Sequence, residues 1–220
     1  MKRTKISVSV GTVIVLLVVS LLTGGAIADG NALIGDIDLD GDAYTTKDLL
    51  MFGAYFLIGP AAFSGHLAES SEASDINLDG RRLTVSDLML GIFVAAGMHD
   101  PHDPPPVESP NIAYFAQDMV NGTINLSTDD SLGAVWLEFK GKAIPADRPD
   151  LITIQYEFDG VMTRVLMYEY NSFTFLTGGV IYTYVGDGEL TTVSAATYDA
   201  RYVECVIDNQ SDVIEGPEST

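Results

Sequence analysis

The order of apolar and polar positions divides the chain into a helical part followed by a strand-rich part. Two runs, 48–58 and 87–96, are almost wholly apolar after their first residue, and glycine follows both, as Gly59-Pro60 and as Gly97. Glycine after the last turn is a common helix stop. The runs predict two helices that pack on each other, because such apolar helices are not stable alone, and residues 60–74 form the connector.

After residue 110 the pattern changes to short runs that are rich in β-branched and aromatic residues. Turn signals such as Asp159-Gly160 separate them. Strand runs at these intervals, without helical periods, predict an antiparallel β-sandwich of seven or eight strands. The strong runs are 134–140, 151–158, 164–170, 180–185 and 202–207, and weaker ones lie near 122–126, 173–176 and 190–195.

A proline-rich stretch separates the two parts. Residues 99–110 hold five of the nine prolines and show neither a helical nor an alternating apolar pattern, which is typical of an extended, fairly stiff linker. We therefore predict a multidomain protein with a small α-helical module at 29–98 and an all-β antiparallel sandwich at 111–210. Residues 211–220 are expected to form a disordered tail.

The first residues are typical of an export signal. Three basic residues within the first five positions precede an almost wholly apolar run at 6–22, and Ala26-Ile-Ala28 fits a cleavage site. The sequence predicts a signal peptide at 1–28 and a secreted, extracellular or cell-surface protein. The alternative is an uncleaved anchor, because the run approaches the length of a membrane span. No later run is as long, so after cleavage we expect no membrane association.

Charge and cysteine usage narrow the classes of function further. The formal charge is −20 and falls to −23 without the three basic residues of the signal segment. A chain this acidic repels nucleic acid and anionic lipid surfaces, so we expect no nucleic-acid partner. The single cysteine, Cys205, shares a predicted strand face with Val203 and Ile207 and has no basic neighbour, so it is expected to be a buried structural thiol.

Two acidic loops repeat at an interval of 39 residues. Asp36-Ile-Asp38-Leu-Asp40-Gly41 leads to Asp48, and Asp75-Ile-Asn77-Leu-Asp79-Gly80 leads to Asp87. A hard cation such as Ca²⁺ takes six to eight oxygen ligands, and the glycine relieves the sharp turn after the third side-chain ligand. Each loop precedes a predicted helix, so the repeat predicts two calcium ions. The alternative is a pair of solvated acidic turns.

The repeat resembles the dockerin family over residues 35–97. That family has paired calcium loops, each followed by one helix, in a module of about this length, and here too no predicted helix precedes the first loop. The resemblance implies an EF-hand-like module with two calcium ions. The ligands that it implies are Asp36, Asp38, Asp40, Thr45 and Asp48 in the first loop and Asp75, Asn77, Asp79, Thr84 and Asp87 in the second.

Both loops are one residue longer than the usual twelve. Counting backward from the last carboxylate places Tyr44 and Leu83 where paired loops touch, and Thr45 and Thr84 at a position that ligates directly or through water. The extra residue then follows the glycine. Two alternatives for the backbone carbonyl ligand stay open in each loop, Asp42 or Ala43 in the first and Arg81 or Arg82 in the second.

The resemblance also implies a protein partner, because dockerins bind cohesin modules on a scaffold or a cell surface. The residues that decide the pairing lie at the start of each helix. By alignment these are Thr46, Lys47, Val85 and Ser86. Members of the family often show a Ser-Thr pair here, and this chain does not, so the identity of the partner is open.

The strand-rich part shows no arrangement typical of an active site. Its carboxylates, such as Glu138, Glu157, Asp159 and Glu169, are expected as surface charges, and no histidine follows position 102. We therefore predict that the protein is not an enzyme. Tyrosines at alternate positions would form an aromatic sugar-binding face or, alternatively, pack the sandwich; they are Tyr168, Tyr170, Tyr182 and Tyr184.

The leading hypothesis is an exported, non-catalytic, calcium-binding interaction protein whose dockerin-like module docks on a cohesin-type partner in a cell-surface or extracellular assembly. The sandwich loosely resembles the cohesin-type or carbohydrate-binding sandwiches that accompany dockerins. One alternative is a carbohydrate-binding or adhesion protein with the calcium module as a structural stalk. A further alternative is an accessory to enzymes of polysaccharide breakdown, with carbohydrate as its partner.

Overall fold

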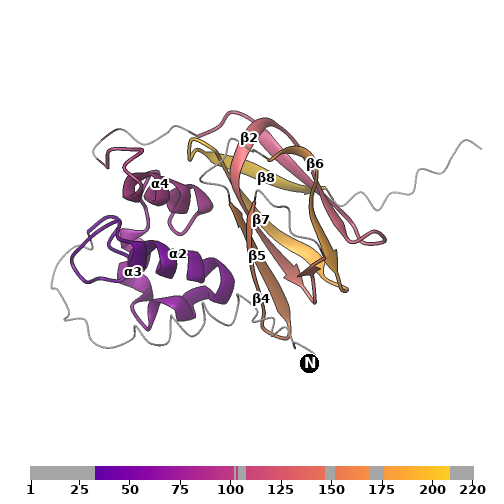
Figure 1. Cartoon of the computed structure of the whole chain (residues 1–220), viewed down its shortest axis with the longest axis horizontal. Coiled ribbons are helices and arrows are strands. Elements are labelled where there is room, and N and C mark those ends of the chain that lie inside the picture. The colour runs from indigo at the N-terminus through magenta and orange to yellow at the C-terminus, as the bar shows by residue number, and fades with distance from the viewer. Residues whose placement is uncertain (1–32, 102, 104–107, 147–151, 169–175, 209–220) are drawn as a thin grey trace, which may run out of the picture.

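The computed structural model describes residues 33–101, 103, 108–146, 152–168 and 176–208. The predicted signal peptide and tail and most prolines of the linker lie outside the described residues, so these predictions stay untested. Within the described residues, a helical region precedes a β-rich domain, as the hydrophobic pattern predicts (Figure 1). None of the helices described here has the length and hydrophobicity needed to cross a membrane.

Both predicted helices are present. Helix α2 spans Thr46–Ile58 and ends at Gly59, whose φ is 68°, and helix α4 spans Val85–Ala95. Each begins two residues before the predicted start, because the threonine that precedes it caps the helix. The connector also contains the 3₁₀-helix η1 at Gly59–Phe63 and helix α3 at Leu67–Ala73. Neither was predicted, since both are short.

The described part of the chain contains eight strands, and every predicted run with described residues contributes to one of them. The two that the sequence did not predict are β1 and β3, and the weak run near 122–126 joins the strong run 134–140 in one long strand. The strands are β1 Ile112–Asp118, β2 Thr123–Lys140, β3 Ile144–Pro145, β4 Thr153–Phe158, β5 Met162–Tyr168, β6 Leu176–Val185, β7 Glu189–Thr197 and β8 Tyr202–Asp208.

Strand β2 belongs to both layers of the sandwich. Its first residues pair with β1 and β6, its residues from Ala134 onward pair with β5 and β7, and the register shifts between the two halves. One layer therefore has the order β4-β5-β2-β7, and the other has the order β1-β2-β6-β3. Strand β8 pairs with both β1 and β7 and so joins the two layers at one edge. All described pairs are antiparallel except β1–β8, where the first and last strands run side by side in the same direction.

The sandwich interior is filled from alternate strand positions. Val135, Leu137 and Phe139 of β2 point inward and are fully buried. Tyr182 and Tyr184 of β6 pack there too, with ring centroids 5.9 and 5.4 Å from that of Phe139. Among the described tyrosines, these two therefore pack in the sandwich core and do not lie in an exposed row.

The opposite face of the β4-β5-β2-β7 layer is covered by helices α2 and α4 (Figure 1). Ala134 and Trp136, which alternate with the inward residues of β2, pack into the same hydrophobic cluster as Phe56 of α2. The Trp136 indole N–H donates a hydrogen bond of 2.7 Å to the carbonyl oxygen of Phe56. Tyr168 also packs against this cluster, and Tyr170 lies outside the described residues. The helical module and the sheet are thus in direct contact.

Cys205 of β8, which was predicted to be buried, is partly buried. Its S–H donates to the Val203 carbonyl oxygen at 3.3 Å, and burial raises the pKa of the thiol to about 12. Since only the thiolate is nucleophilic, the thiol is expected to be inert in the folded protein.

We predict that Cys205 of the native protein reacts with Ellman's reagent at pH 8 at least about 100-fold more slowly than the same chain in guanidinium chloride. Absorbance at 412 nm measures both rates. Rapid stoichiometric labelling of the native protein would show that the thiol is accessible and ionised, contrary to this account.

Candidate metal centre

The two acidic loops have the same backbone conformation. Residues 39 positions apart have matching positive φ angles. These lie in the left-handed region, which residues other than glycine rarely adopt. The pairs are Leu39 and Leu78 at 62° and 55°, Gly41 and Gly80 at 98° and 82°, and Tyr44 and Leu83, both at 60°. The longer loop is thus accommodated in the same way in both copies. Non-glycine residues held in this region cost about 1–3 kcal/mol each and cluster at ligand sites.

The first three carboxylates of the first loop lie close together. One oxygen from each of Asp36, Asp38 and Asp40 falls within 4.8 Å of the others. Backbone N–H groups hold this arrangement, because Asp36 accepts from the N–H groups of Asp40 and Gly41, both at 3.0 Å. The motif therefore brings its carboxylates together as its spacing predicts.

The last carboxylate of each loop ties the loop to its helix. Asp48 Oδ1 accepts from the N–H groups of Ile37 at 2.8 Å and Asp38 at 3.1 Å, while Oδ2 accepts from the Thr45 N–H at 2.8 Å. Asp87 makes the equivalent bonds from Oδ1 to the Asn77 N–H and from Oδ2 to the Thr84 N–H, both at 3.2 Å. Both carboxylates are fully buried.

Thr45 and Thr84 are the N-cap residues of α2 and α4. The Thr45 hydroxyl donates to Asp48 Oδ2 at 2.7 Å, and the Thr84 hydroxyl donates to Asp87 Oδ2 at 2.6 Å. Each hydroxyl also accepts from the backbone N–H of the same aspartate, which completes a capping box. The structure thus gives both threonines a capping role, and their role as calcium ligands stays a prediction.

The electrostatics of the loops favour a bound cation. Burial raises the pKa values of Asp36 and Asp48 and raises the pKa of Asp87 to about 7, because each carboxylate loses hydration. A divalent cation among such groups stabilises their ionised form. Asp40 differs, since the Asp42 N–H and then Lys47 lower the pKa of its carboxyl group.

Asp38 and Lys47 give a second sign that the first loop fits a cation. The Asp38 Oδ2 atom is buried and accepts no hydrogen bond of normal geometry, although the Lys47 ammonium group forms a close ion pair with it. The same ammonium lies 3.2 Å from Asp40 Oδ2. The Lys47 ammonium group therefore contacts two of the predicted ligands at once, which shows that these carboxylates attract a positive charge. The residues present fit calcium.

The second loop carries less negative charge than the first. Asn77 replaces one carboxylate, and its Nδ2 donates to Asp79 Oδ2 at 3.1 Å. Arg81 Nη1 lies 3.9 Å from the same oxygen. Affinity for calcium falls with fewer charged ligands, so the second loop is expected to be the weaker site.

The residues predicted for loop pairing and partner recognition take varied positions. Tyr44 packs on Gly35, where an added Cβ would come within 2.4 Å of the ring, and Tyr44 and Leu83 both line the hydrophobic cluster of the helical module. Gly35, directly before the first loop, donates a backbone hydrogen bond of 2.8 Å to the carbonyl oxygen of Ala73, the last residue of α3. Of the recognition residues, Thr46 is exposed, Lys47 turns back to its loop, and Val85 and Ser86 are buried.

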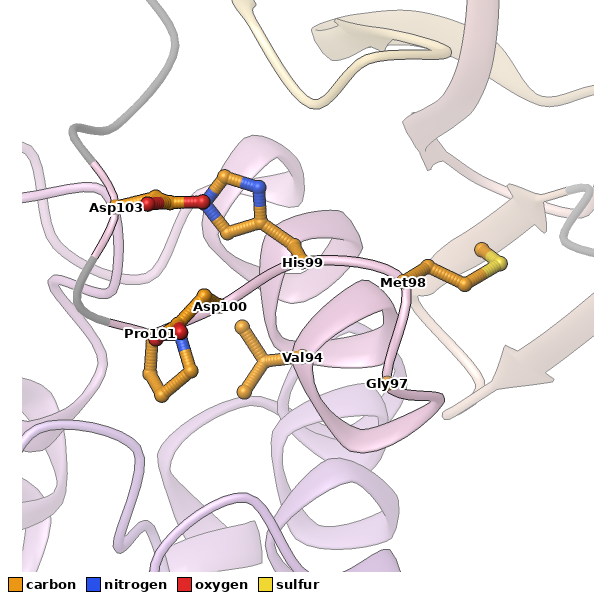
Figure 2. A pocket seen from close by; sticks show the side chains of 7 residues that line it. All are labelled: Val94, Gly97, Met98, His99, Asp100, Pro101 and Asp103. Atoms are coloured by element: carbon orange, nitrogen blue, oxygen red, sulfur yellow. The ribbon is translucent and has the colours of Figure 1, made fainter.

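An open depression lies where α4 ends and the linker begins. Figure 2 shows the His99 and Asp103 side chains turned toward each other across it, with Val94 and Pro101 nearby. The strand carboxylates instead form surface ion pairs, since Arg164 lies 3.0 Å from Glu138 and 3.1 Å from Asp159. Within the described residues, neither the depression nor these ion pairs bring a nucleophile and a base together.

Comparisons with known proteins add little to the geometry. No protein-family model matches the sequence, and no curated protein matches it. A non-cellulosomal cohesin from the hyperthermophilic archaeon Archaeoglobus fulgidus aligns at 11% identity and a TM-score of 0.30, covering 45% of this chain and 86% of that one. A type I cohesin–dockerin complex from Clostridium thermocellum aligns at 6% identity and a TM-score of 0.31, covering 49% and 94%.

We predict that Thr45→Val lowers the free energy of unfolding by about 1 kcal/mol at saturating calcium, since it removes the capping hydroxyl. Thr45→Ser should restore most of the loss. Thr46→Val is the matched control. Thr46 is the neighbouring residue and is exposed, and its replacement by valine makes the same change from one β-branched side chain to another. Guanidinium unfolding monitored by circular dichroism measures all three. Equal stability of Thr45→Val and Thr46→Val would contradict the capping role.

Proposed function

We propose that this chain is an exported, non-catalytic protein-docking protein whose helical module is folded by two calcium ions. The observation that carries the proposal is the repeat itself: two loops 39 residues apart share their left-handed residues and the hydrogen bonds of their last carboxylate. Two independent acidic turns have no reason to agree in both respects. Export is proposed from the sequence of the N-terminal segment.

Asp36, Asp38 and Asp40, with Asp48 at the end of the loop, would hold calcium in the first site. Asp75, Asn77, Asp79 and Asp87 would hold it in the second. A bound calcium ion supplies positive charge where several carboxylates otherwise repel one another at close range. The capping threonines keep the start of each helix in register with its loop. The module would therefore lose its structure when calcium is removed.

The docking role is supported by the apolar character of both helices. Helices α2 and α4 bury aromatic residues against a sheet, which shows that this module covers an apolar β-surface. A partner of the cohesin type is proposed from the sequence resemblance of the loops alone. We do not propose a carbohydrate-binding face, because Tyr182 and Tyr184, two of the four tyrosines in that alternative, are buried.

Calorimetric titration of the chelator-treated mature protein should show two calcium ions per chain. Asp40→Ala should remove the first site and Asp79→Ala the second, each with a loss of helicity. Asp42→Ala is the matched control, because Asp42 is an exposed acidic neighbour that is not among the predicted side-chain ligands.

Two results would contradict the proposal. One is a wild-type protein that takes up no calcium and keeps its helicity in chelator. The other is an Asp40→Ala protein that binds calcium as Asp42→Ala does, since the acidic cluster would then act only through its net charge.

A further inference from the structure

The outer face of the β4-β5-β2-β7 layer has two zones. Under the helices it is apolar, with Ala134 and Ala196 fully buried and Leu166 nearly so. One step farther along the same face it turns polar, where Glu138 of β2 pairs in register with Arg164 of β5 and binds it at 3.0 Å. An apolar centre with a polar rim is the usual anatomy of a surface that a partner covers.

The sandwich does not need this outer face for its own core. Its interior holds a separate cluster of buried residues, which includes Phe115, Phe139 and Tyr182. The residues under the helices belong to a second cluster, together with the core of the helical module. The sheet thus packs one hydrophobic surface inside the sandwich and presents another to the helices.

A few large side chains anchor the helices on this face. The Phe56 ring meets the Trp136 ring edge-on at 5.9 Å, and the Phe93 ring meets Tyr198 at 5.8 Å. The Met89 methyl group approaches Gly133 so closely that a Cβ built there would lie 3.2 Å from it. Aromatic anchors in close-packed contact carry most of the energy of protein interfaces.

The edge of the contact adds polar interactions from the second loop. The Arg81 guanidinium lies 4.3 Å from the centroid of the Tyr202 ring and forms an ion pair with Glu108. Tyr202 belongs to β8, and Glu108 lies at the end of the linker. The loop that carries Asp79 therefore touches the sandwich directly.

We propose that the outer face of the β4-β5-β2-β7 layer is a docking surface for a helical module of this kind, and that the module of a second copy of this chain can occupy it. In the structure, the chain's own module is the occupant. Because that module is tethered to the sandwich in the same chain, it binds the face intramolecularly and excludes the module of a second copy unless its own contact is blocked. The inference deepens the proposed function by identifying a partner for the docking module.

Complementary variants test the proposal in the full mature chain. Ala196→Arg places a long charged side chain on the sheet face and leaves the module intact, whereas Met89→Arg blocks the module and leaves the sheet face intact. Each variant alone should be folded and monomeric. Mixed in calcium at about 50 µM, they should form a heterodimer, because one intact module then meets one intact face. Light scattering should show a doubled mass.

The single tryptophan gives an independent readout, because Trp136 lies within the contact. Its emission should shift to longer wavelength in Met89→Arg, where the face is bare, and shift back when Ala196→Arg is added. Tyr114→Arg is the matched control for Ala196→Arg. Tyr114 is exposed on the other layer, so that variant keeps its own module docked and should form no heterodimer with Met89→Arg.

Leu166→Arg and Phe93→Arg form a second pair, so that the test does not depend on one substitution at each surface. If all four variants lose cooperative unfolding, the face is an integral core and the proposal is wrong. It is also wrong if the variants fold and bind calcium but stay monomeric when mixed. A heterodimer that forms equally well in chelator supports this inference while overturning the calcium dependence of the proposed function.

Discussion

The carboxylates of Asp48 and Asp87 each join an acidic loop to the helix that follows it, and the rest of the helical module depends on this junction. Each buried carboxylate accepts hydrogen bonds from the beginning of its loop and from the N-cap threonine at the end. The orientation of α2 and α4 therefore follows from the loops. A cation bound by the loops would stabilise the helices through the same junction, and calcium would in this way affect a surface several residues away.

The junction also connects the loops to the sheet. Because α2 and α4 are apolar on most sides, they are stable only when they pack on each other and on another surface. The outer face of the β4-β5-β2-β7 layer supplies that surface, with Trp136 as the central contact. The loops thus position the helices, and the helices pack on the sheet. A change in the loops is therefore expected to alter the contact between the helices and the sheet.

Local patterns in the sequence predicted most of the elements but few of the long-range contacts. The apolar runs gave α2 and α4, and the loop spacing brought Asp36, Asp38 and Asp40 together, because both depend on neighbours in the chain. The parallel pairing of β1 with β8 and the bond from Trp136 to Phe56 join residues about 80 or more positions apart, and no local pattern specifies them. Alternation showed that Tyr182 and Tyr184 share a face but not that it is the inner one.

The central claim is that the two loops bind calcium, and native mass spectrometry of the intact mature chain tests it most directly. The account predicts a species that carries two calcium ions, with a single-ion species at lower calcium because the second loop is the weaker site. A chain that appears only without calcium, at calcium concentrations up to a few millimolar, would contradict the account, since sites of this class bind within that range.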